Sequence, residues 1–205
     1  MYALVACQAS IKVLITLAAM LDWELDCFDV KRAFLHGTLK EDIYMKQPQG
    51  FEQYGPTGML LLCHLLHSIY GLKQAALDWY ELLSSVLHAL GFIKNKVDLA
   101  VFVYDTALPD GCHIICIIAW HVDDDLGGSN NQTFLNWVKE KIKDWFGISD
   151  MGPMSLYLRI KIEHNRVTRK VWIHQETYIR YLCDEYGLSN ANIVSTPMDH
   201  HHLFG

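Results

Sequence analysis

The sequence predicts a single α+β domain. Helix-length apolar patterns alternate along the chain with short strand-like runs, and no low-complexity linker, internal repeat or charge block divides it. The hydrophobic fraction of 51% and the charged fraction of 20% are those of a globular chain. A length of 205 residues also suffices for a substantial core. We therefore treat residues 1–205 as one folding unit.

The apolar N-terminal run, residues 3–21, is predicted to be a core helix. Gln8, Ser10 and Lys12 interrupt the run, and no Lys or Arg precedes it, which argues against a signal or membrane segment. The apolar positions at helical spacing are Ile11, Leu14, Ile15 and Ala18. We expect no membrane association.

The remaining elements follow from periodicity and turn signals. Strands are expected at 22–29, 42–47, 99–104 and 112–122, a hairpin at 156–163 and 167–173, and helices at 72–90, 131–146 and 176–186. Gly91 and Gly187 are natural stops for two of these helices. The helix over 131–146 has one apolar stripe, formed by Phe134, Val138, Ile142 and Phe146.

Cysteine spacing and net charge narrow the class of protein. The six cysteines have no paired spacing, which indicates reduced thiols and an intracellular compartment. Cys63 with His64 and His67, or Cys112 with Cys116, would be half of a zinc site, but neither has a second half. The net charge of -6 argues against wholesale nucleic-acid binding, which usually needs a basic surface.

Three consecutive carboxylates, Asp123, Asp124 and Asp125, follow an apolar run in the stretch AWHVDDDLGG. The Leu-Gly-Gly that follows them allows a tight turn, so we expect the acids at or near the end of a strand. Gathering carboxylates is unfavourable unless hard cations neutralise them. The triplet alone leaves two interpretations open, a metal-bearing turn and a solvated acidic turn.

Five segments resemble, in order, the reverse transcriptase of copia-type retrotransposons. The first is DVKRAFLHGTLKEDIYMKQPQGF (29–51), the second SIYGLKQAALDWY (68–80), and the third HVDD (121–124), where the family has Tyr-Val-Asp-Asp. FGISDMGPMSLYLRI (146–160) and the late segments HQETYIRYL and VSTPM (174–182, 194–198) also match. The resemblance runs from about Ile11 to Met198.

The resemblance implies a fold and a chemistry. The fold would be a polymerase palm-like antiparallel sheet with helices packed on one face, a partial fingers region and the start of a thumb, with the palm core at about 22–164. Asp29, Asp123 and Asp124 would be catalytic and would hold two Mg²⁺ ions, with Mn²⁺ as an alternative. Such ions activate the primer 3′-hydroxyl and stabilise the leaving pyrophosphate. Asp125 lies outside the family pair, and we expect it to be solvated or capping.

The same match assigns a nucleotide and template pocket. Phe34 would lie under the incoming sugar and favour deoxynucleotides; the alternative is a core aromatic. The other pocket residues would be Tyr70, Gly71, Lys73, Gln74 and His121. Three residues depart from the family pattern: His121 replaces Tyr, Ala76 replaces Pro, and Arg159 replaces the Gly of a Leu-Gly-Ile segment.

The partners implied are an RNA template, a DNA primer and deoxynucleoside triphosphates, together with the integrase and ribonuclease H of a Pol polyprotein. The chain begins after the family's basic fingers segment, so we expect a truncated domain whose activity alone is doubtful. Two alternatives stay open. One is a catalytically dead retroelement remnant, and the other is a domesticated module that binds nucleic acid or protein.

Overall fold

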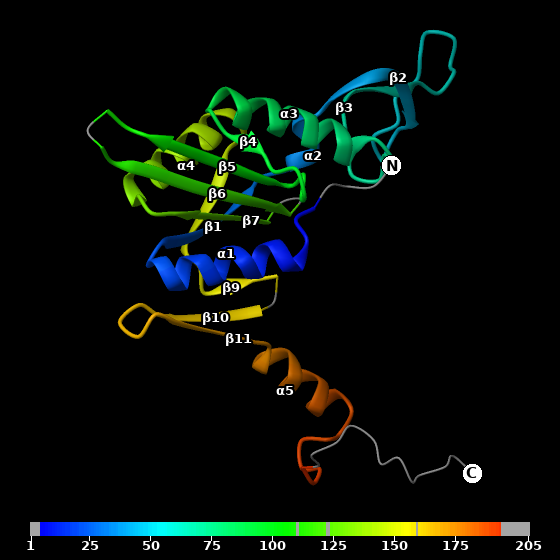
Figure 1. Ribbon diagram of the computed structural model, residues 1–205. Coiled ribbons are helices and arrows are strands. Elements are labelled where there is room, and N and C mark those ends of the chain that lie inside the picture. Colours follow the sequence, from blue (N-terminus) through cyan, green and yellow to red (C-terminus); the bar gives the residue numbers. More distant parts are fainter. Residues whose placement is uncertain (1–4, 110, 122–123, 159, 194–205) are drawn as a thin grey trace.

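A computed structural model describes residues 5–109, 111–121, 124–158 and 160–193 (Figure 1). The helices are α1 (Gln8–Leu21), α2 (Ala33–His36), α3 (Ala75–Ala89), α4 (Gln132–Phe146) and α5 (Glu176–Glu185). The strands are β1 (Glu24–Val30), β2 (Thr38–Lys46), β3 (Leu62–His67), β4 (Ile93–Lys94), β5 (Val101–Ala107), β6 (His113–His121), β7 (Asp124–Ser129), β8 (Ile148–Pro153), β9 (Leu156–Tyr157), β10 (Ile160–Asn165) and β11 (Lys170–His174). The predicted α+β class is confirmed.

The central sheet has six strands in the order β4-β5-β6-β7-β1-β8. Each strand pairs antiparallel with its neighbours. β6 and β7 form a hairpin, and β1, which comes from far earlier in the chain, pairs between β7 and β8. The two strands that carry acidic motifs, β1 and β7, are therefore inner strands of the sheet.

Helices cover both faces of this sheet, which corrects the expectation that they pack on one face. In Figure 1, α1 lies on one side and α3 and α4 lie on the other. Two neighbouring glycines of β7 show why. A Cβ on Gly128 would lie 2.7 Å from Leu14 of α1, whereas a Cβ on Gly127 would lie 2.8 Å from Leu135 of α4. Successive strand residues point to opposite faces, so both faces of β7 are apolar and both need a helix.

The same glycines show that the predicted Leu-Gly-Gly turn is wrong. Leu126, Gly127 and Gly128 lie in the middle of β7, and all three are buried. The lack of side chains lets α1 and α4 approach the sheet closely, which is a common use of glycine in a strand. β3, β8 and the short α2 were also not predicted.

The predicted core faces of the helices are largely confirmed. The α1 residues Ile11, Leu14, Ile15 and Ala18 are all buried. On α4, Val138, Ile142 and Phe146 are buried as expected, but Phe134 is only partly buried and Leu135 faces the core. No helix among the described residues is long and apolar enough to cross a membrane.

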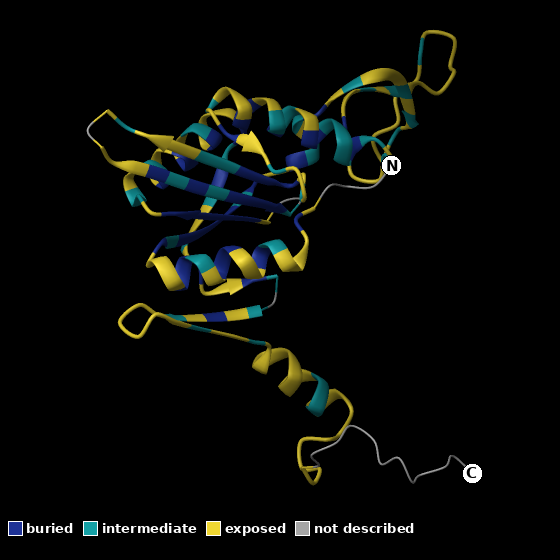
Figure 2. Cartoon of the chain, in the orientation of Figure 1, coloured by how far each residue is buried: buried dark blue, intermediate teal, exposed yellow. Residues whose placement is uncertain are grey.

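Two smaller sheets extend from the central body. β2 and β3 form a two-stranded arm, and β9, β10 and β11 form a three-stranded sheet on the α1 side. Figure 2 shows that buried residues concentrate in the central sheet and in the helix faces that contact it, whereas the arm and α5 are mostly exposed. No residue of α5 is buried. The central sheet therefore carries the core of the described chain.

Candidate active site

Asp29 and Asp124 lie directly opposite each other on β1 and β7. On the other side of Asp124, His121 is its partner on β6, and on the other side of Asp29, Ser149 is its partner on β8. Directly opposed residues of antiparallel strands share one face, with Cβ atoms about 4.5–5.5 Å apart. The four side chains thus form a row at the ends of these strands, on the face that α1 also covers.

The two carboxylates of this row oppose each other electrostatically. Burial, and then the negative charge of Asp124, raise the pKa of Asp29, although Lys31 acts in the opposite direction. Asp29 is partly buried, and Asp124 is exposed. A hard cation bound between these oxygen ligands would remove the repulsion.

The predicted third ligand, Asp123, lies outside the described residues, as do Val122 and Arg159. Among the residues that the structure describes, no group of three His, Cys, Asp or Glu side chains is arranged to hold a metal ion. The structure therefore brings together the two predicted ligands that it describes.

Asp125 is not solvated, and that expectation is wrong. Its exposed fraction is 1%, and it lies opposite Phe28 of β1 and Trp120 of β6. Since Asp124 and Asp125 are adjacent in a strand, they point to opposite faces, and Asp125 points into the core between the sheet and the helices α3 and α4. Only Asp124 of this pair is placed beside Asp29.

Two buried side chains near Asp29 and Asp124, those of Cys27 and Tyr157, were not predicted from the sequence as part of the site. Burial and then the charges of neighbouring acids raise the pKa of Cys27 to about 12, so this thiol stays protonated. The hydroxyl of Tyr157 donates a hydrogen bond of 3.4 Å to the backbone carbonyl oxygen of Asp124. Burial, followed by the charge of Asp125, raises the pKa of Tyr157 as well. Tyr157 thus joins β9 to the start of β7 as a neutral group.

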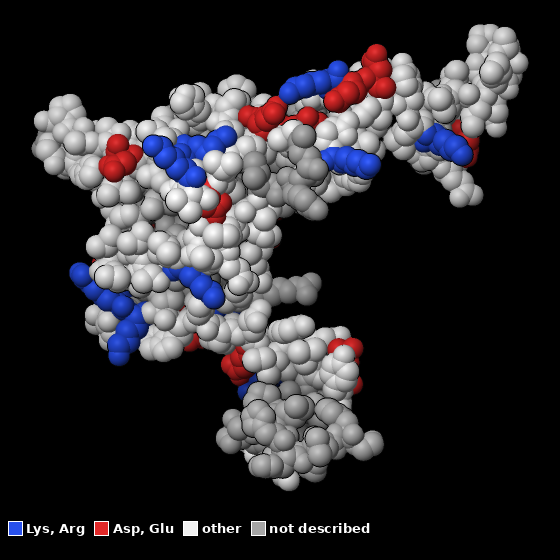
Figure 3. Space-filling model, turned by 45° about the vertical axis from the view of Figure 1, so that its right-hand side comes forward, with Lys and Arg blue, Asp and Glu red and all other residues white. Residues whose placement is uncertain are grey.

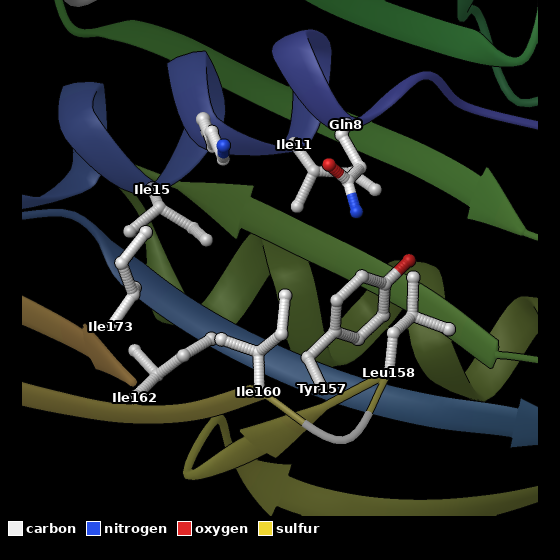
Figure 4. Close-up of a pocket in the computed structure, with 9 residues that line it drawn as sticks. Gln8, Ile11, Ile15, Tyr157, Leu158, Ile160, Ile162 and Ile173 are labelled. Atoms are coloured by element: carbon white, nitrogen blue, oxygen red, sulfur yellow. The ribbon is translucent and has the colours of Figure 1, made fainter. Parts of the chain in front are cut away.

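A nearby pocket between α1 and the three-stranded sheet is apolar (Figure 4). Tyr157 lines it, and most of its other walls are aliphatic: Ile11, Ile15, Leu158, Ile160, Ile162 and Ile173. None of the described lining residues is a carboxylate. Besides Tyr157, Lys12 and Gln8 are the polar residues among the described lining, so the pocket adds no carboxylate to the row.

Phe34 and Tyr70, both predicted for the nucleotide pocket, are in contact. Their ring centroids are 4.6 Å apart, with an angle of 54° between the planes. Phe34 belongs to α2, which follows β1 directly, and it is partly buried against the core. Tyr70 is 54% exposed. Phe34 is therefore a core-supported aromatic with an exposed ring beside it, a position compatible with both of its sequence-based interpretations.

The other pocket candidates flank the start of α3. Gly71 has a φ of +101°, a left-handed value that favours glycine, so its backbone role is sufficient to explain it. Gln74 is the N-cap residue of α3, and its side-chain amide donates a 3.4 Å hydrogen bond to Glu41 of β2. Lys73 is exposed. Ala76, where the family has Pro, is in the first turn of α3.

Charged side chains are interspersed on the described surface. On the face that Figure 3 shows, Lys and Arg lie among Asp and Glu and do not form a continuous basic area. Lys31, Arg32 and Lys73 are exposed near the candidate site. Electrostatic attraction for a nucleic acid backbone is therefore modest on this face.

Comparison with known proteins gives one consistent result. The model of the family "Reverse transcriptase (RNA-dependent DNA polymerase)" matches residues 1–200. The retrovirus-related Pol polyprotein from transposon TNT 1-94 of Nicotiana tabacum is 38% identical over 194 residues, which are 95% of this chain and 14% of the relative. The Pol polyprotein from transposon RE1 of Arabidopsis thaliana is 33% identical over 93% of this chain and 12% of that relative.

The chain thus spans about one-seventh to one-eighth of the length of these two copia-type relatives. Among solved structures, an apo telomerase from Candida tropicalis truncated from its C-terminal domain is similar, with a TM-score of 0.42 and 10% identity over 83% of this chain and 40% of that chain. That likeness is too distant to assign a fold. The family model matches nearly the whole length of the chain, and the chain therefore belongs to the reverse transcriptase (RNA-dependent DNA polymerase) family.

Proposed function

We propose that this chain carries the nucleotidyl-transfer site of a copia-type reverse transcriptase, with Asp29, Asp123 and Asp124 as ligands of two Mg²⁺ ions. The observation that supports this most strongly is the placement of Asp29 opposite Asp124 on adjacent strands. Two carboxylates from segments far apart in the sequence meet there, and burial, followed by the charge of Asp124, raises the pKa of Asp29. Such a pair is unfavourable in the free protein and favourable around a cation.

The donor set fits magnesium. Mg²⁺ prefers carboxylate oxygens and keeps several waters, so it needs an open site rather than a closed cage. Asp124 is exposed and Asp29 is partly buried, which leaves the site open on one side. When bound, Mg²⁺ would supply Lewis-acid activation of the primer hydroxyl and neutralise charge on the triphosphate.

The protein side chains around the pair would position the substrate. Phe34 packs against the core on one side and against Tyr70 on the other, so its ring has a fixed position. It lies in the short helix α2, which follows Asp29 in the sequence. A fixed ring under the sugar would exclude a 2′-hydroxyl by its volume. The substrates that we propose are therefore deoxynucleoside triphosphates, added to a DNA primer on an RNA template.

Exposed cations near this site are few. Lys31, Arg32 and Lys73 are the basic residues on the segments that flank Phe34 and Tyr70, and the net charge of the chain is -6. Template, primer and triphosphate all carry negative phosphates, so binding needs further positive charge. We propose that other parts of a Pol polyprotein supply it, alongside the integrase and ribonuclease H activities.

The metal site can be tested directly with Mn²⁺, whose free form gives a strong electron paramagnetic resonance signal. Adding the 205-residue chain should reduce that signal, and Asp29→Asn should weaken the binding at least tenfold. Asp144→Asn is the matched control, because Asp144 is a carboxylate on the exposed side of α4. Equal Mn²⁺ binding by Asp29→Asn and the unmutated chain would refute the site.

Activity needs a second experiment, because metal binding alone does not separate an enzyme from a dead remnant. Residues 1–200 would replace the matching segment of the tobacco relative, and primer extension on an RNA template would be measured. Extension that Asp124→Asn abolishes supports the proposed function. A graft that folds and binds Mn²⁺ but extends no primer would show that this chain is a catalytically dead remnant.

A further inference from the structure

A buried cluster of charges lies on the opposite face of β1 from Asp29. The ammonium group of Lys139, on α4, donates hydrogen bonds to the carboxylates of Asp26 on β1 (2.5 Å) and Asp150 on β8 (2.9 Å). Gln132, near the start of α4, also donates to Asp26, at 3.0 Å. One helix side chain is thus bonded to two adjacent strands of the sheet.

The cluster is built into the core. Lys139 is 5% exposed and Asp26 is 4% exposed, and Lys139 is the one buried residue among the Lys and Arg that the structure describes. Burial acts to lower the pKa of Lys139, but the hydrogen bonds that its ammonium group donates to the two carboxylates outweigh it, and the net direction is upward. The ammonium group is therefore charged, and it balances charge that would otherwise be uncompensated in the interior.

The pairing of β1 with β8 is irregular at this cluster. Cys27 lies opposite Gly152, whereas the next residue, Phe28, lies opposite Asp150. Met151 is left without a partner, which makes a β-bulge on β8. The second carboxylate oxygen of Asp150 accepts a 2.9 Å hydrogen bond from the backbone N–H of Gly152 and so holds the bulge closed.

Register decides which side chains of β1 lie beside those of its two neighbours. Asp29 is three residues from Asp26, about 10 Å along the strand. A slip of β1 by one residue against both β7 and β8 would move every side chain of β1 to the other face, and Asp29 would leave Asp124. A bulge is a place where two alternative registers are close in geometry, so an additional contact is needed to select one.

We propose that Lys139 is a positioning residue. It ties β1 to α4 through Asp26 and β8 to α4 through Asp150, and because Leu135 of α4 also packs on β7 at Gly127, the helix holds Asp29 opposite Asp124. The importance of that placement for catalysis rests on the function proposed above, but the positioning itself does not. Buried ion pairs contribute little net stability compared with apolar residues of similar volume, and their best-attested use is to specify one arrangement. Lys139 reaches both strands at once, which suits that use.

The decisive variant is the double substitution Asp26→Leu/Lys139→Met. It replaces the buried pair by apolar side chains of similar volume, so the protein should stay folded with stability near that of the unmutated chain. Lys141→Met is the matched control, because Lys141 is on the same helix and its side chain is 44% exposed. Asp150→Asn is a milder variant that leaves the Asp26 pair intact.

Nuclear magnetic resonance reads the register directly. In the unmutated chain and in Lys141→Met, backbone nuclear Overhauser contacts should connect Phe28 with Asp150 and Asp29 with Asp124. In the double variant these contacts should weaken at least twofold or appear as two sets, and Mn²⁺ affinity should fall at least tenfold. Asp150→Asn should weaken the Phe28–Asp150 contact while the Asp29–Asp124 contact remains.

Two results would overturn the inference. One is a folded double variant with the full set of contacts, which would show that packing alone sets the register. The other is a double variant that does not fold, which would show that the cluster supplies stability rather than register. If the unmutated chain binds no Mn²⁺ and the contacts still change as expected, the proposed function fails and the positioning role stands.

Discussion

Removing one carboxylate of the opposed pair should stabilise the metal-free protein. Asp29→Asn and Asp124→Asn each keep the shape of the side chain and remove one of two facing charges. For charges about 5 Å apart in a medium close to water, Coulomb's law gives a repulsion of about 0.8 kcal/mol. The low value for water applies because Asp124 is exposed. Screening in 0.1 M salt lowers the expected gain to about 0.5 kcal/mol.

The pH dependence has a definite sign. The pKa of Asp29 is raised in the folded protein, so the folded state binds its proton more tightly than the unfolded chain does. Stability therefore falls as pH rises from the ordinary value of 3.8 through the raised pKa, and the whole penalty is present above the raised pKa. The advantage of Asp29→Asn should be full above that raised pKa and should disappear below the ordinary value, where both states are protonated.

Urea unfolding followed by tryptophan fluorescence measures this effect, because Trp79 and Trp120 are both 2% exposed and report on the core. With a chelator present, either single variant should gain about 0.5 kcal/mol. The double variant should gain about the same rather than twice as much, since both substitutions remove one shared repulsion. Mg²⁺ at ten times its Kd should stabilise the unmutated chain by about 1.4 kcal/mol and the variants by much less.

The reasoning fails if Asp29→Asn and Asp124→Asn each lower the free energy of unfolding in the absence of metal. It also fails if the gains of the two single variants add in the double variant, because additive gains would mean that the two carboxylates do not interact. A uniform response of all variants to Mg²⁺ would place the metal elsewhere.

Three further expectations concern single features. In a complete copia-type enzyme that carries residues 29–51 of this chain, Phe34→Val should increase ribonucleotide incorporation relative to deoxynucleotides, and unchanged selection in primer-extension assays would leave Phe34 as a core aromatic. The 205-residue chain alone should bind Mg²⁺ without extending a primed RNA template, because its net charge is -6; extension that Asp123→Asn abolishes would contradict this. Gly128→Ala should lower the free energy of unfolding in urea by about 1–3 kcal/mol, because its Cβ would meet Leu14 at 2.7 Å; an unchanged midpoint would show that α1 can shift.

The spacing of apolar residues was enough to predict the helices that bury one face against the sheet. The four predicted inward positions of α1 follow helical spacing. β8, with the sequence ISDMGP, has no such pattern because a bulge interrupts it. The two glycines of β7 were read as a turn because Gly-Gly usually marks one. Only the contacts from α1 and α4, which are distant in sequence, show why glycine is needed in the strand.

The residues of the candidate site were predicted mainly from their match to family motifs, and only partly from the physical chemistry of the sequence. The acidic triplet gave the residue types, and the family resemblance joined Asp29 with Asp123, with Asp124 as a supporting carboxylate; the position of Asp124 opposite Asp29 comes from the strand register. Successive side chains of β7 point to opposite faces of the sheet, so Asp124 and Asp125 point to different faces. This could not be predicted from the sequence, because it depends on where β7 begins. Lys139 gave no signal at all, because its two partners are 113 and 11 residues away in the sequence. A buried charge is recognisable only once its counter-charges are in place.

The two aspartates of β1 show how one strand can place identical side chains in different surroundings. Asp26 and Asp29 are an odd number of residues apart, so they point to opposite faces of the sheet. On the α4 face, the fold supplies a cation at 2.5 Å from Asp26. On the α1 face, Lys31 lowers the pKa of Asp29, yet burial and Asp124 outweigh it and the net shift is upward. The fold therefore compensates Asp26 with a cation of its own and leaves Asp29 with a raised pKa beside Asp124, which agrees with the cation site proposed above.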